Sequence, residues 1–544
     1  MDSLARSLAI GVPGLEPCVA SSIPFPVLHG AEFLGVEANW VTNFTTPVSR
    51  VLFPEPFLPS TPPLSFCNVT LAHTHPGLHD RILTQVWLPM DDNVVPWNGQ
   101  FVGVGGGGFQ TGLLGGSGGS AAAVALGYSA VTTDGGHTVE NIGDPSKWAL
   151  ASEGNVNMHA LQNFASVSLA DAAVIGKSVT AQFYNREADR SYFVGCSTGG
   201  RQALMLAQRY PRLYDGYLSG APALYFSEFL VTMLRGQVRM AELGYAPPPC
   251  EMAEFTRRAV AACDALDGVE DGIISEPEMC FETFDPRKVV GAEFECAELG
   301  KKLMLSDKGA DIVMTFWDGW KERDEDGNEK RIWDGTGHQI HLNGDIFTIA
   351  RTECDYSTGE PRCQPAPFQI YMQWLQYFLY ATNQPIDITK ITTAELGRLL
   401  QKSRQLYDSA IRTADPDLSG LREAGGKVLM WHGLSDGVIP FNQSRRYYED
   451  VVAFDQKRVD EYMRYFEAPG VDHCGGGPEG LFPHTIFQAL KDWVEKGKKP
   501  ETLPAQTEPD AGGLRWQRML CNHPKRAKYD GKGDVRVAAS YSCK

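Results

Sequence analysis

Hydrophobic and polar positions follow two different periods between residues 69 and 225. Four short, apolar-rich runs predict strands: "ILTQVWLP" (82–89), "GQFVGVGGGG" (99–108), "GYSAVTTD" (127–134) and "RSYFVG" (190–195). The segment "SLADAAVIGKSVTAQFY" (168–184) instead repeats its apolar residues with the period of a helix. Strands that alternate with helices are typical of βαβ units. A parallel sheet is therefore expected in this part of the chain.

The pattern changes over residues 226–405, which hold most of the aromatic and cysteine-rich stretches. "TFWDGWKERDEDGNEKRIW" predicts a hairpin that turns at Asp326-Gly327, and "FQIYMQWLQYFLYATN" predicts an amphipathic aromatic helix. Buried-strand patterns return in "GKVLMWHGLSDGVIP" (426–440) and "EYMRYFEAPGVDHCGGG" (461–477). The simplest architecture is an α/β fold: residues 1–225 and 406–544 form one domain, and residues 226–405 are a large insertion, called the lid below.

One strand-to-helix junction carries a candidate nucleophile. Gly195-Cys196-Ser197-Thr198-Gly199 fits the G-x-S-x-G pattern, in which a serine stands on a sharp turn above the sheet. Small neighbours let the following helix pack closely on the strand. The helix N-terminus also presents N–H groups to a developing oxyanion, and the Thr198 N–H is the natural first donor. The alternative is a glycine-rich turn without chemistry.

The downstream sequence supplies an acid and a base in the order that an α/β-hydrolase requires. Asp436 directly follows one apolar strand, and His473 follows the next. Asp472 is a poor rival acid, because a residue adjacent to the histidine would point away from its ring. His432 is expected to buttress the Asp436 loop, and His484 lies at a predicted helix start.

Cysteines stand beside both of these catalytic candidates. Cys196 precedes Ser197, and Cys474 follows His473. If the serine and histidine are within hydrogen-bond reach, their neighbours are close enough for a disulfide, although two free buried cysteines remain an alternative. An even total of 12 cysteines suggests disulfides and an oxidising compartment.

We therefore expect a secreted protein. The start "MDSLARSLAIGVPG" is not a convincing signal peptide, so either a leader has been removed or the protein is not secreted. N-x-[ST] sequons at Asn43, Asn68 and Asn442 give weaker support for secretion and glycosylation.

Composition narrows the range of partners. The chain has 544 residues, 43% of them hydrophobic, which is enough for a large core. A formal net charge of −17 disfavours nucleic acid, because phosphate binding needs basic surface. No apolar run approaches the roughly 18–20 residues that cross a bilayer. A small molecule is the expected partner.

The glycine run "GVGGGG" (103–108) allows two interpretations. Gly103, Gly105 and Gly108 match the dinucleotide fingerprint G-x-G-x-x-G, which would suit an NAD-dependent oxidoreductase. Consecutive glycines satisfy that spacing trivially, however, and Asp134 comes later than the expected acid. In a hydrolase, this loop would instead supply the second N–H group that donates to the oxyanion, and Gly107 is expected to be that donor.

In combination, these motifs resemble the tannase and feruloyl esterase family of α/β-hydrolases. The resemblance rests on "SYFVGCSTGGRQ", "WHGLSDGVIP" and "VDHCGGG", and extends upstream through "VTLAHTHPGLHDRILTQVWLP", "WNGQFVGVGGGG" and "GYSAVTTDGGHT". It implies a serine carboxylic ester hydrolase acting on esters of aromatic or phenolic acids such as gallate, ferulate or related cinnamates. The family framework also suggests further disulfide pairs: Cys18–Cys67, Cys263–Cys280, Cys354–Cys363 and Cys521–Cys543, which leaves Cys250 and Cys296. Sequence alone does not establish this connectivity.

An acidic loop in the lid, "CDALDGVEDGIISEPEMC" (263–280), has the oxygen density that suits Ca²⁺, although it is not an EF-hand and could be a solvated turn. The resemblance implies a structural calcium ion there. The implied ligands are the carboxylates of Asp264, Asp267 and Asp271 and the carbonyls of Val269 and Ile273.

Three histidines in "HTHPGLHD", His73, His75 and His79, invite a second metal hypothesis, with Asp80 as an oxygen ligand. Asp80 directly follows His79 and would point away from it, and Pro76-Gly77 breaks any helix. A loop that leads into the next strand is favoured.

The expected mechanism is two-step acyl transfer by Ser197, with His473 as base and Asp436 as its orienting acid. The aromatic lid would stack on a planar acyl group. The alternatives are an acyltransferase or lactonase with the same triad, an NAD-dependent oxidoreductase that uses the glycine loop, or a binding protein without activity.

Overall fold

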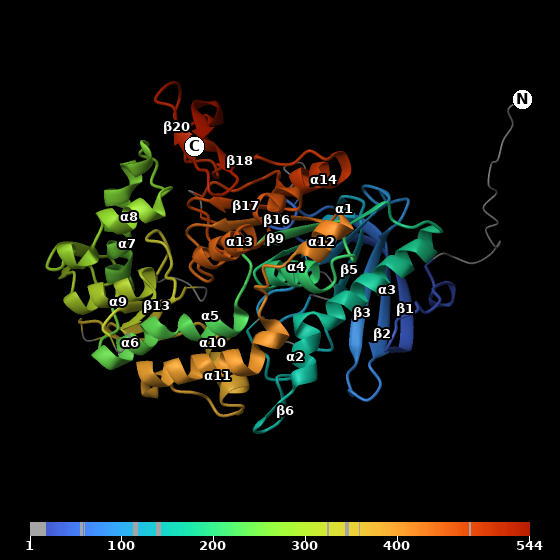
Figure 1. The fold of residues 1–544 in the computed structure, drawn as a ribbon, viewed down its shortest axis with the longest axis horizontal. Coiled ribbons are helices and arrows are strands. Elements are labelled where there is room, and N and C mark those ends of the chain that lie inside the picture. The colour runs from blue at the N-terminus through green and yellow to red at the C-terminus, as the bar shows by residue number, and fades with distance from the viewer. Residues whose placement is uncertain are drawn as a thin grey trace, which may run out of the picture.

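A nine-stranded sheet forms the centre of the molecule, and helices cover both of its faces (Figure 1). The computed structural model describes residues 18–54, 58, 60–112, 118–137, 143–323, 326–342, 348–357, 359–477 and 480–544. Across the sheet the strands follow the order β1 (Glu32–Phe44), β2 (Leu64–Thr74), β3 (Ile82–Pro89), β5 (Ser129–Thr133), β4 (Gln100–Val104), β8 (Arg190–Cys196), β9 (Gly216–Gly220), β16 (Lys427–Gly433) and β17 (Met463–Ala468).

The expectation of a parallel sheet holds for only one half of it. From β4 through β8, β9 and β16 to β17, neighbouring strands are parallel. The pairs β1–β2, β2–β3 and β3–β5 are antiparallel. The physical reason is the length of the connection: residues 75–81 join β2 to β3 without a helix, and such a short link can only reverse the chain.

Alternating side chains give the sheet two cores. Phe101 and Phe193 point to the face covered by α3 (Val167–Tyr184), α4 (Thr198–Arg209) and α13 (Phe441–Asp455). Val102 and Val194 point to the opposite face, covered by α1 (Gly118–Ala125) and α14 (Ile486–Lys496). The α/β-hydrolase fold expected from the sequence is thus confirmed.

Among the described helices, none is by itself long and apolar enough to cross a bilayer, although α2 (Met158–Ala165) and α3 together, bent by 51°, would pass on length and composition alone. The remaining small elements of this part of the molecule are β6 (Leu150–Ser152), β7 (Asn155–Val156) and α12 (Ser419–Ala424).

The lid lies beside the sheet, at the left of Figure 1. Its helices are α5 (Phe226–Thr232), α6 (Arg235–Leu243), α7 (Pro249–Cys263), α8 (Pro277–Thr283), α9 (Asp307–Trp317) and α10 (Gln369–Gln373). A further helix, α11 (Thr393–Ile411), begins in the lid and continues past the expected boundary at residue 405. Three two-stranded ribbons accompany them: β10 (Glu293–Cys296) with β11 (Lys301–Met304), β12 (Trp320–Arg323) with β13 (Glu329–Trp333), and β14 (Thr352–Asp355) with β15 (Arg362–Pro365). The apolar core of the lid is continuous with the core under α3 and α4.

Both structural predictions for the lid are confirmed. Strands β12 and β13 form the expected hairpin. The aromatic segment starts as α10 and continues as a π-helix over Trp374–Leu379, where Trp374 and Phe378 stack at 4.4 Å between ring centroids.

Six disulfides pair all twelve cysteines: Cys18–Cys67, Cys196–Cys474, Cys250–Cys296, Cys263–Cys280, Cys354–Cys363 and Cys521–Cys543. These are the pairs that the sequence and the family resemblance suggest.

The C-terminal segment, residues 502–544, is bound to the lid by ion pairs. It contains the ribbons β18 (Thr502–Gln506) with β19 (Gln517–Cys521) and β20 (Ala527–Tyr529) with β21 (Tyr541–Cys543). Arg518 contacts Asp271 at 2.6 Å, and Arg526 contacts both Glu276 and Glu278 at 2.7 Å.

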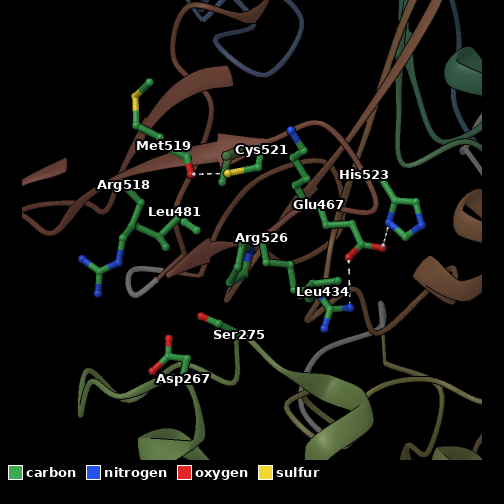
Figure 2. Close-up of a pocket in the computed structure, with 14 residues that line it drawn as sticks. Asp267, Ser275, Leu434, Glu467, Leu481, Arg518, Met519, Cys521, His523 and Arg526 are labelled. Atoms are coloured by element: carbon green, nitrogen blue, oxygen red, sulfur yellow. Dashed lines mark hydrogen bonds and ion pairs between the residues drawn. The ribbon is translucent and has the colours of Figure 1, made fainter. Parts of the chain in front are cut away.

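A cavity of about 40 Å³ lies at this junction. Figure 2 shows its lining residues, with Asp267 and Ser275 of the lid facing Arg518 and Arg526. Neither the candidate serine nor the candidate histidine lines it. The cavity therefore belongs to the junction and not to the candidate catalytic site.

Candidate active site

Ser197 occupies a strained turn between β8 and α4. Its backbone angles are φ 62° and ψ −125°, in a region that non-glycine residues rarely adopt. The Ser197 N–H donates to the carbonyl of Gly220 at 3.0 Å, and its own carbonyl accepts from Arg201 N–H at 3.0 Å. These bonds hold the residue at the carboxyl edge of the sheet.

The glycines around the serine are required by close backbone packing. A Cβ on Gly195 would lie 2.3 Å from the backbone of Gly199, and one on Gly200 would lie 2.3 Å from the carbonyl oxygen of Gly220. No side chain fits at such distances. The strand and helix can therefore approach closely enough to form the sharp turn.

His473 and Asp436 meet at the carboxyl ends of β17 and β16. The Nδ1 of His473 lies 2.8 Å from Oδ2 of Asp436. Asp472 instead lies beside His341, with 3.2 Å between Oδ2 and Nδ1. The structure thus joins His473 to Asp436 and turns the neighbouring acid elsewhere.

The Asp436 carboxylate is buried but fully supplied with hydrogen-bond donors. Its Oδ1 accepts from the N–H groups of Val438 and Ile439, both at 2.8 Å, and its Oδ2 accepts from His473 and His432. Burial alone would raise the pKa of Asp436, but the two histidines beside it hold that pKa well below its usual value. The side chain is therefore a fixed negative charge next to His473.

His432 has the buttressing place expected from the sequence. Its Nε2 lies 3.0 Å from both Asp436 Oδ2 and the carbonyl oxygen of Ile439, and its Nδ1 lies 2.7 Å from Ser444 Oγ. A carbonyl oxygen can only accept, so Nε2 carries the proton that points at Asp436.

The disulfide between Cys196 and Cys474 joins the serine turn to the histidine loop, with 5.8 Å between the two Cα atoms. Ser197 and His473 line one cavity of about 300 Å³. Within the described residues, no hydrogen bond to Ser197 Oγ is formed, and His473 Nε2 lies 3.7 Å from Cys474 Sγ. Hydrogen bonds between a catalytic serine and its histidine are often long before substrate binds.

The glycine loop is packed against α4 in a way that overturns the dinucleotide interpretation. Gly105 N–H donates to the carbonyl of Val194 at 3.0 Å, Gly106 N–H donates to Gln202 Oε1 at 3.0 Å, and Thr198 Oγ1 donates to the carbonyl of Gly108 at 2.7 Å. Along the described residues the next helix, α1, begins ten residues beyond the loop, so the loop does not lead directly into a helix as the dinucleotide fingerprint requires.

Several cavity walls were not identified from the sequence. Phe368 and Ile370 reach the cavity from the lid, and Val51 and Leu52 reach it from the segment before β2. The aromatic stretch that includes Phe368 gave a signal in the sequence. The pattern around residues 49–52 gave none.

The acidic loop of the lid brings the implied calcium ligands into one short turn. Asp264 accepts from the N–H groups of Asp271 and Gly272 at 3.0 and 2.9 Å, and Asp267 accepts from Val269 N–H at 2.9 Å. Burial raises the pKa of Asp271 to about 7; Arg518 opposes this shift, and the two other aspartates add to it. Carboxylate and carbonyl oxygens are the ligands that a hard divalent cation prefers.

Comparisons with known proteins agree with this geometry. The family described as "Tannase and feruloyl esterase" matches residues 67–544. The chain belongs to the tannase and feruloyl esterase family. It is therefore a carboxylic ester hydrolase, and the oxidoreductase alternative is set aside.

Individual relatives of this esterase cover nearly its whole length. A protein from Arthroderma benhamiae named "Probable feruloyl esterase" is 37% identical over 96% of this chain and 93% of its own. The tannase of Aspergillus oryzae is 29% identical over 87% of this chain and 84% of its own. The tannin acyl hydrolase from Aspergillus niger superimposes with a TM-score of 0.83 at 27% identity, covering 97% of this chain and 95% of that chain.

Removal of the Cys196–Cys474 bridge tests its role in this esterase. We expect the double variant Cys196→Ala/Cys474→Ala to lose about 10²-fold in kcat/KM on a soluble ester, because displacement of the histidine loop by about 1 Å disrupts its alignment with the serine. The matched control, Cys521→Ala/Cys543→Ala, removes a bridge that closes only 22 residues in the C-terminal segment. It should lower the melting temperature while kcat stays near wild type. Equal activity in the two double variants at a temperature where both are folded would contradict the assigned role.

Proposed function

We propose that this esterase hydrolyses esters of hydroxycinnamic acids, with Ser197 as nucleophile, His473 as general base and Asp436 as the acid that orients it. One observation carries the catalytic assignment: Ser197 and His473 line a single cavity, and His473 Nδ1 is hydrogen-bonded to the buried carboxylate of Asp436. This is the arrangement of groups that activates a serine hydroxyl.

The proton and the acyl group move in two steps. His473 Nε2 takes the hydroxyl proton as Ser197 Oγ bonds to the ester carbonyl carbon, and the imidazolium then gives that proton to the departing alcohol. In the second step the same nitrogen takes a proton from water as the water oxygen attacks the acyl carbon. The imidazolium then returns this proton to Ser197 Oγ as the acyl C–O bond breaks, which releases the acid and the free serine. Asp436 stabilises the imidazolium in both steps and stays ionised.

Two backbone N–H groups are suited to the oxyanion. Thr198 is the first residue of α4, so its N–H is not used within the helix. In the glycine loop, the N–H groups of Gly105 and Gly106 already donate to other acceptors. Gly107 and Gly108 follow them and line the cavity, and of these two Gly107 is the proposed second donor.

The cavity walls favour a planar acid with few polar substituents. Val51, Leu52, Phe368, Ile370 and Val438 supply apolar surface, and the glycines opposite them let a flat ring approach the backbone. Ser49 and Gln110 are the polar side chains beside them. A hydroxycinnamate, with one phenolic hydroxyl, suits this lining better than gallate, which would bury three. The relative at 37% identity carries a feruloyl esterase name, in agreement with this choice.

A structural calcium ion in the lid is part of the proposal. Asp264, Asp267 and Asp271 with the carbonyls of Val269 and Ile273 would provide five oxygen ligands. Among the described residues, no choice of one oxygen atom from each of the three carboxylates brings all three atoms within 4.8 Å of one another. An ion would draw the loop together and offset the repulsion among the aspartates.

An extracellular location completes the proposal. Six disulfides would persist only in an oxidising compartment. Of the three sequons, Asn43 is exposed, whereas Asn68 and Asn442 are half-buried. Asn43 is therefore the proposed glycan acceptor.

The nucleophile is tested by covalent labelling. A fluorophosphonate probe should label the wild-type protein at one site, and Ser197→Ala should abolish the labelling. Asp436→Asn should retain the fold but lower kcat about 10⁴-fold, because the asparagine no longer fixes the histidine tautomer. Unchanged labelling in Ser197→Ala would assign the nucleophile to another residue.

The substrate class is tested by comparing methyl ferulate, methyl gallate and a plain aliphatic methyl ester. We expect kcat/KM for ferulate to exceed that for gallate by about 10-fold or more, because a buried hydroxyl without a partner costs about 1–3 kcal/mol. Phe368→Ala should lower the ferulate value more than the aliphatic one. A preference for the aliphatic ester would overturn the substrate class and leave the triad in place.

Calcium removal is expected to lower the melting temperature of the wild-type protein, and added CaCl₂ to restore it. Asp264→Asn should lose this response, because it removes one charged ligand. Glu270→Gln changes an exposed acid of the same loop and should respond like wild type. A response that is identical in the two variants would contradict the ligand assignment.

A further inference from the structure

A second group of metal-ligating side chains lies on the antiparallel half of the sheet, where the catalytic assignment makes no use of them. His73 is the penultimate residue of β2, His75 directly follows that strand, and Asp171 lies in the second turn of α3. One ligand atom from each residue can be chosen so that all three lie within 4.8 Å of one another. None of the three lines the catalytic cavity.

The distances within this group resemble those around a small tetrahedral ion. Asp171 Oδ2 lies 3.1 Å from His75 Nε2 and 3.8 Å from His73 Nε2. Two ligand atoms that bind one Zn²⁺ ion at the tetrahedral angle are about 3.3 Å apart, since each bond is about 2.0–2.1 Å. The observed pair of distances brackets this value.

His73 gives an independent reason to expect a ligand. Its side chain is fully buried, and neither ring nitrogen has a hydrogen-bond partner among the described residues. Its ladder partners, Phe33 and Ile82, fix the backbone on both sides. A buried imidazole without partners loses the hydrogen bonds that it makes in water. A ligand bound beside Asp171 would compensate for this loss by using the imidazole lone pair.

Asp80 supports His75 from the outer side. Its Oδ2 lies 2.7 Å from His75 Nδ1, and its Oδ1 accepts from the backbone N–H of His75 at 2.7 Å. Thr74 Oγ1 and Asn163 Nδ2 also donate to this carboxylate, at 3.1 and 3.0 Å. A carboxylate that accepts a hydrogen bond from one ring N–H keeps the proton on that nitrogen and leaves the lone pair of the other nitrogen free for a metal.

We propose that His73, His75 and Asp171 bind one divalent transition-metal ion of the Zn²⁺ type, with Asp80 orienting His75. The carboxylates of Asp171 and Asp80 balance the charge of such an ion. The side chains of His75 and Asp171 are 14% and 13% exposed, so water can reach the fourth coordination position. The ion ties the end of β2 to α3 across the intervening strand β3, and its role is structural.

This assignment differs from the grouping suggested by the sequence. His79 is exposed and lies outside the cluster, and Asp80 acts on His75 instead of on the metal. The ligand that completes the group, Asp171, is about a hundred residues away in the sequence. The other cluster of this kind in the described part of the chain contains Cys250 and Cys296, which are bound to each other in a disulfide.

Two nitrogen ligands distinguish this site from the oxygen-only loop of the lid. Ca²⁺ prefers oxygen ligands, whereas imidazole nitrogen is a good ligand for Zn²⁺ and other first-row transition-metal ions. The same contacts without a metal require a second proton on His75, so that an imidazolium bridges Asp80 and Asp171. Measurement of the metal content of the protein distinguishes the metal-bound state from the imidazolium state, because only the metal-bound state contains an ion.

The experiment uses the full-length protein, stripped with a chelator, returned to chelator-free buffer with saturating CaCl₂, and titrated with ZnCl₂. Bound zinc is measured by mass spectrometry after dialysis, and thermal stability is measured in parallel. Wild type should hold one equivalent of zinc and gain in melting temperature. His75→Ala and the nearly isosteric Asp171→Asn should each weaken zinc binding at least tenfold and lose the gain.

His79→Asn is the matched control, because it changes a neighbouring histidine outside the cluster and asparagine tolerates the positive φ of 58° found there. It should bind zinc like wild type. Near-ultraviolet circular dichroism and activity on a soluble ester confirm that each variant is folded. Wild-type protein that binds no more zinc than folded Asp171→Asn, or loss of zinc in His79→Asn equal to that in His75→Ala, would overturn the proposal.

Discussion

The bridge between Cys196 and Cys474 solves a problem of distance that the sheet alone leaves open. Strands β8 and β17, which lead to the serine and the histidine, are separated by β9 and β16. Three strand spacings of about 4.8 Å amount to about 14 Å, far more than a hydrogen bond. The loop after β17 must therefore reach back across two strands. The disulfide holds it there, with its anchor points one residue away from Ser197 and His473, the proposed nucleophile and base.

The acid lies between these two ends, and its burial makes the histidine's orientation permanent. A carboxylate removed from water is stable only if its oxygens are supplied with donors, and Asp436 has two backbone N–H groups and two imidazoles. Rotation of Asp436 would break several of these bonds at once. His432 therefore positions Asp436, and Ser444 in turn positions His432.

The sequence predicted those parts of the site that short local motifs specify. The glycines around Ser197, the acid after one strand and the histidine after the next are local patterns, and the adjacent cysteines connect the serine turn with the histidine loop in the sequence itself. Sheet direction could not be obtained in this way, because the pattern of residues 64–74 was not recognised as a strand, and the short reversing link between β2 and β3 was therefore not recognised either. Asp171 was also out of reach. Its position in α3 has an ordinary helical pattern, and only the packing of α3 on the sheet brings it to His73 and His75.

The packing of the lid determines how the substrate cavity obtains its shape. Phe368 and Ile370 belong to an insertion whose apolar core is continuous with that beneath α3 and α4, so they cannot withdraw without exposing buried surface. On the far side, the acidic turn of the lid is paired with Arg518 and Arg526 of the C-terminal segment. A part of the chain held on two sides acts as a wall more than as a hinged flap. Under the proposed assignment, selectivity for the acyl group depends on the width between the glycine loop and the lid, and a residue that changes that width should alter the choice of substrate without altering the chemistry proposed for Ser197.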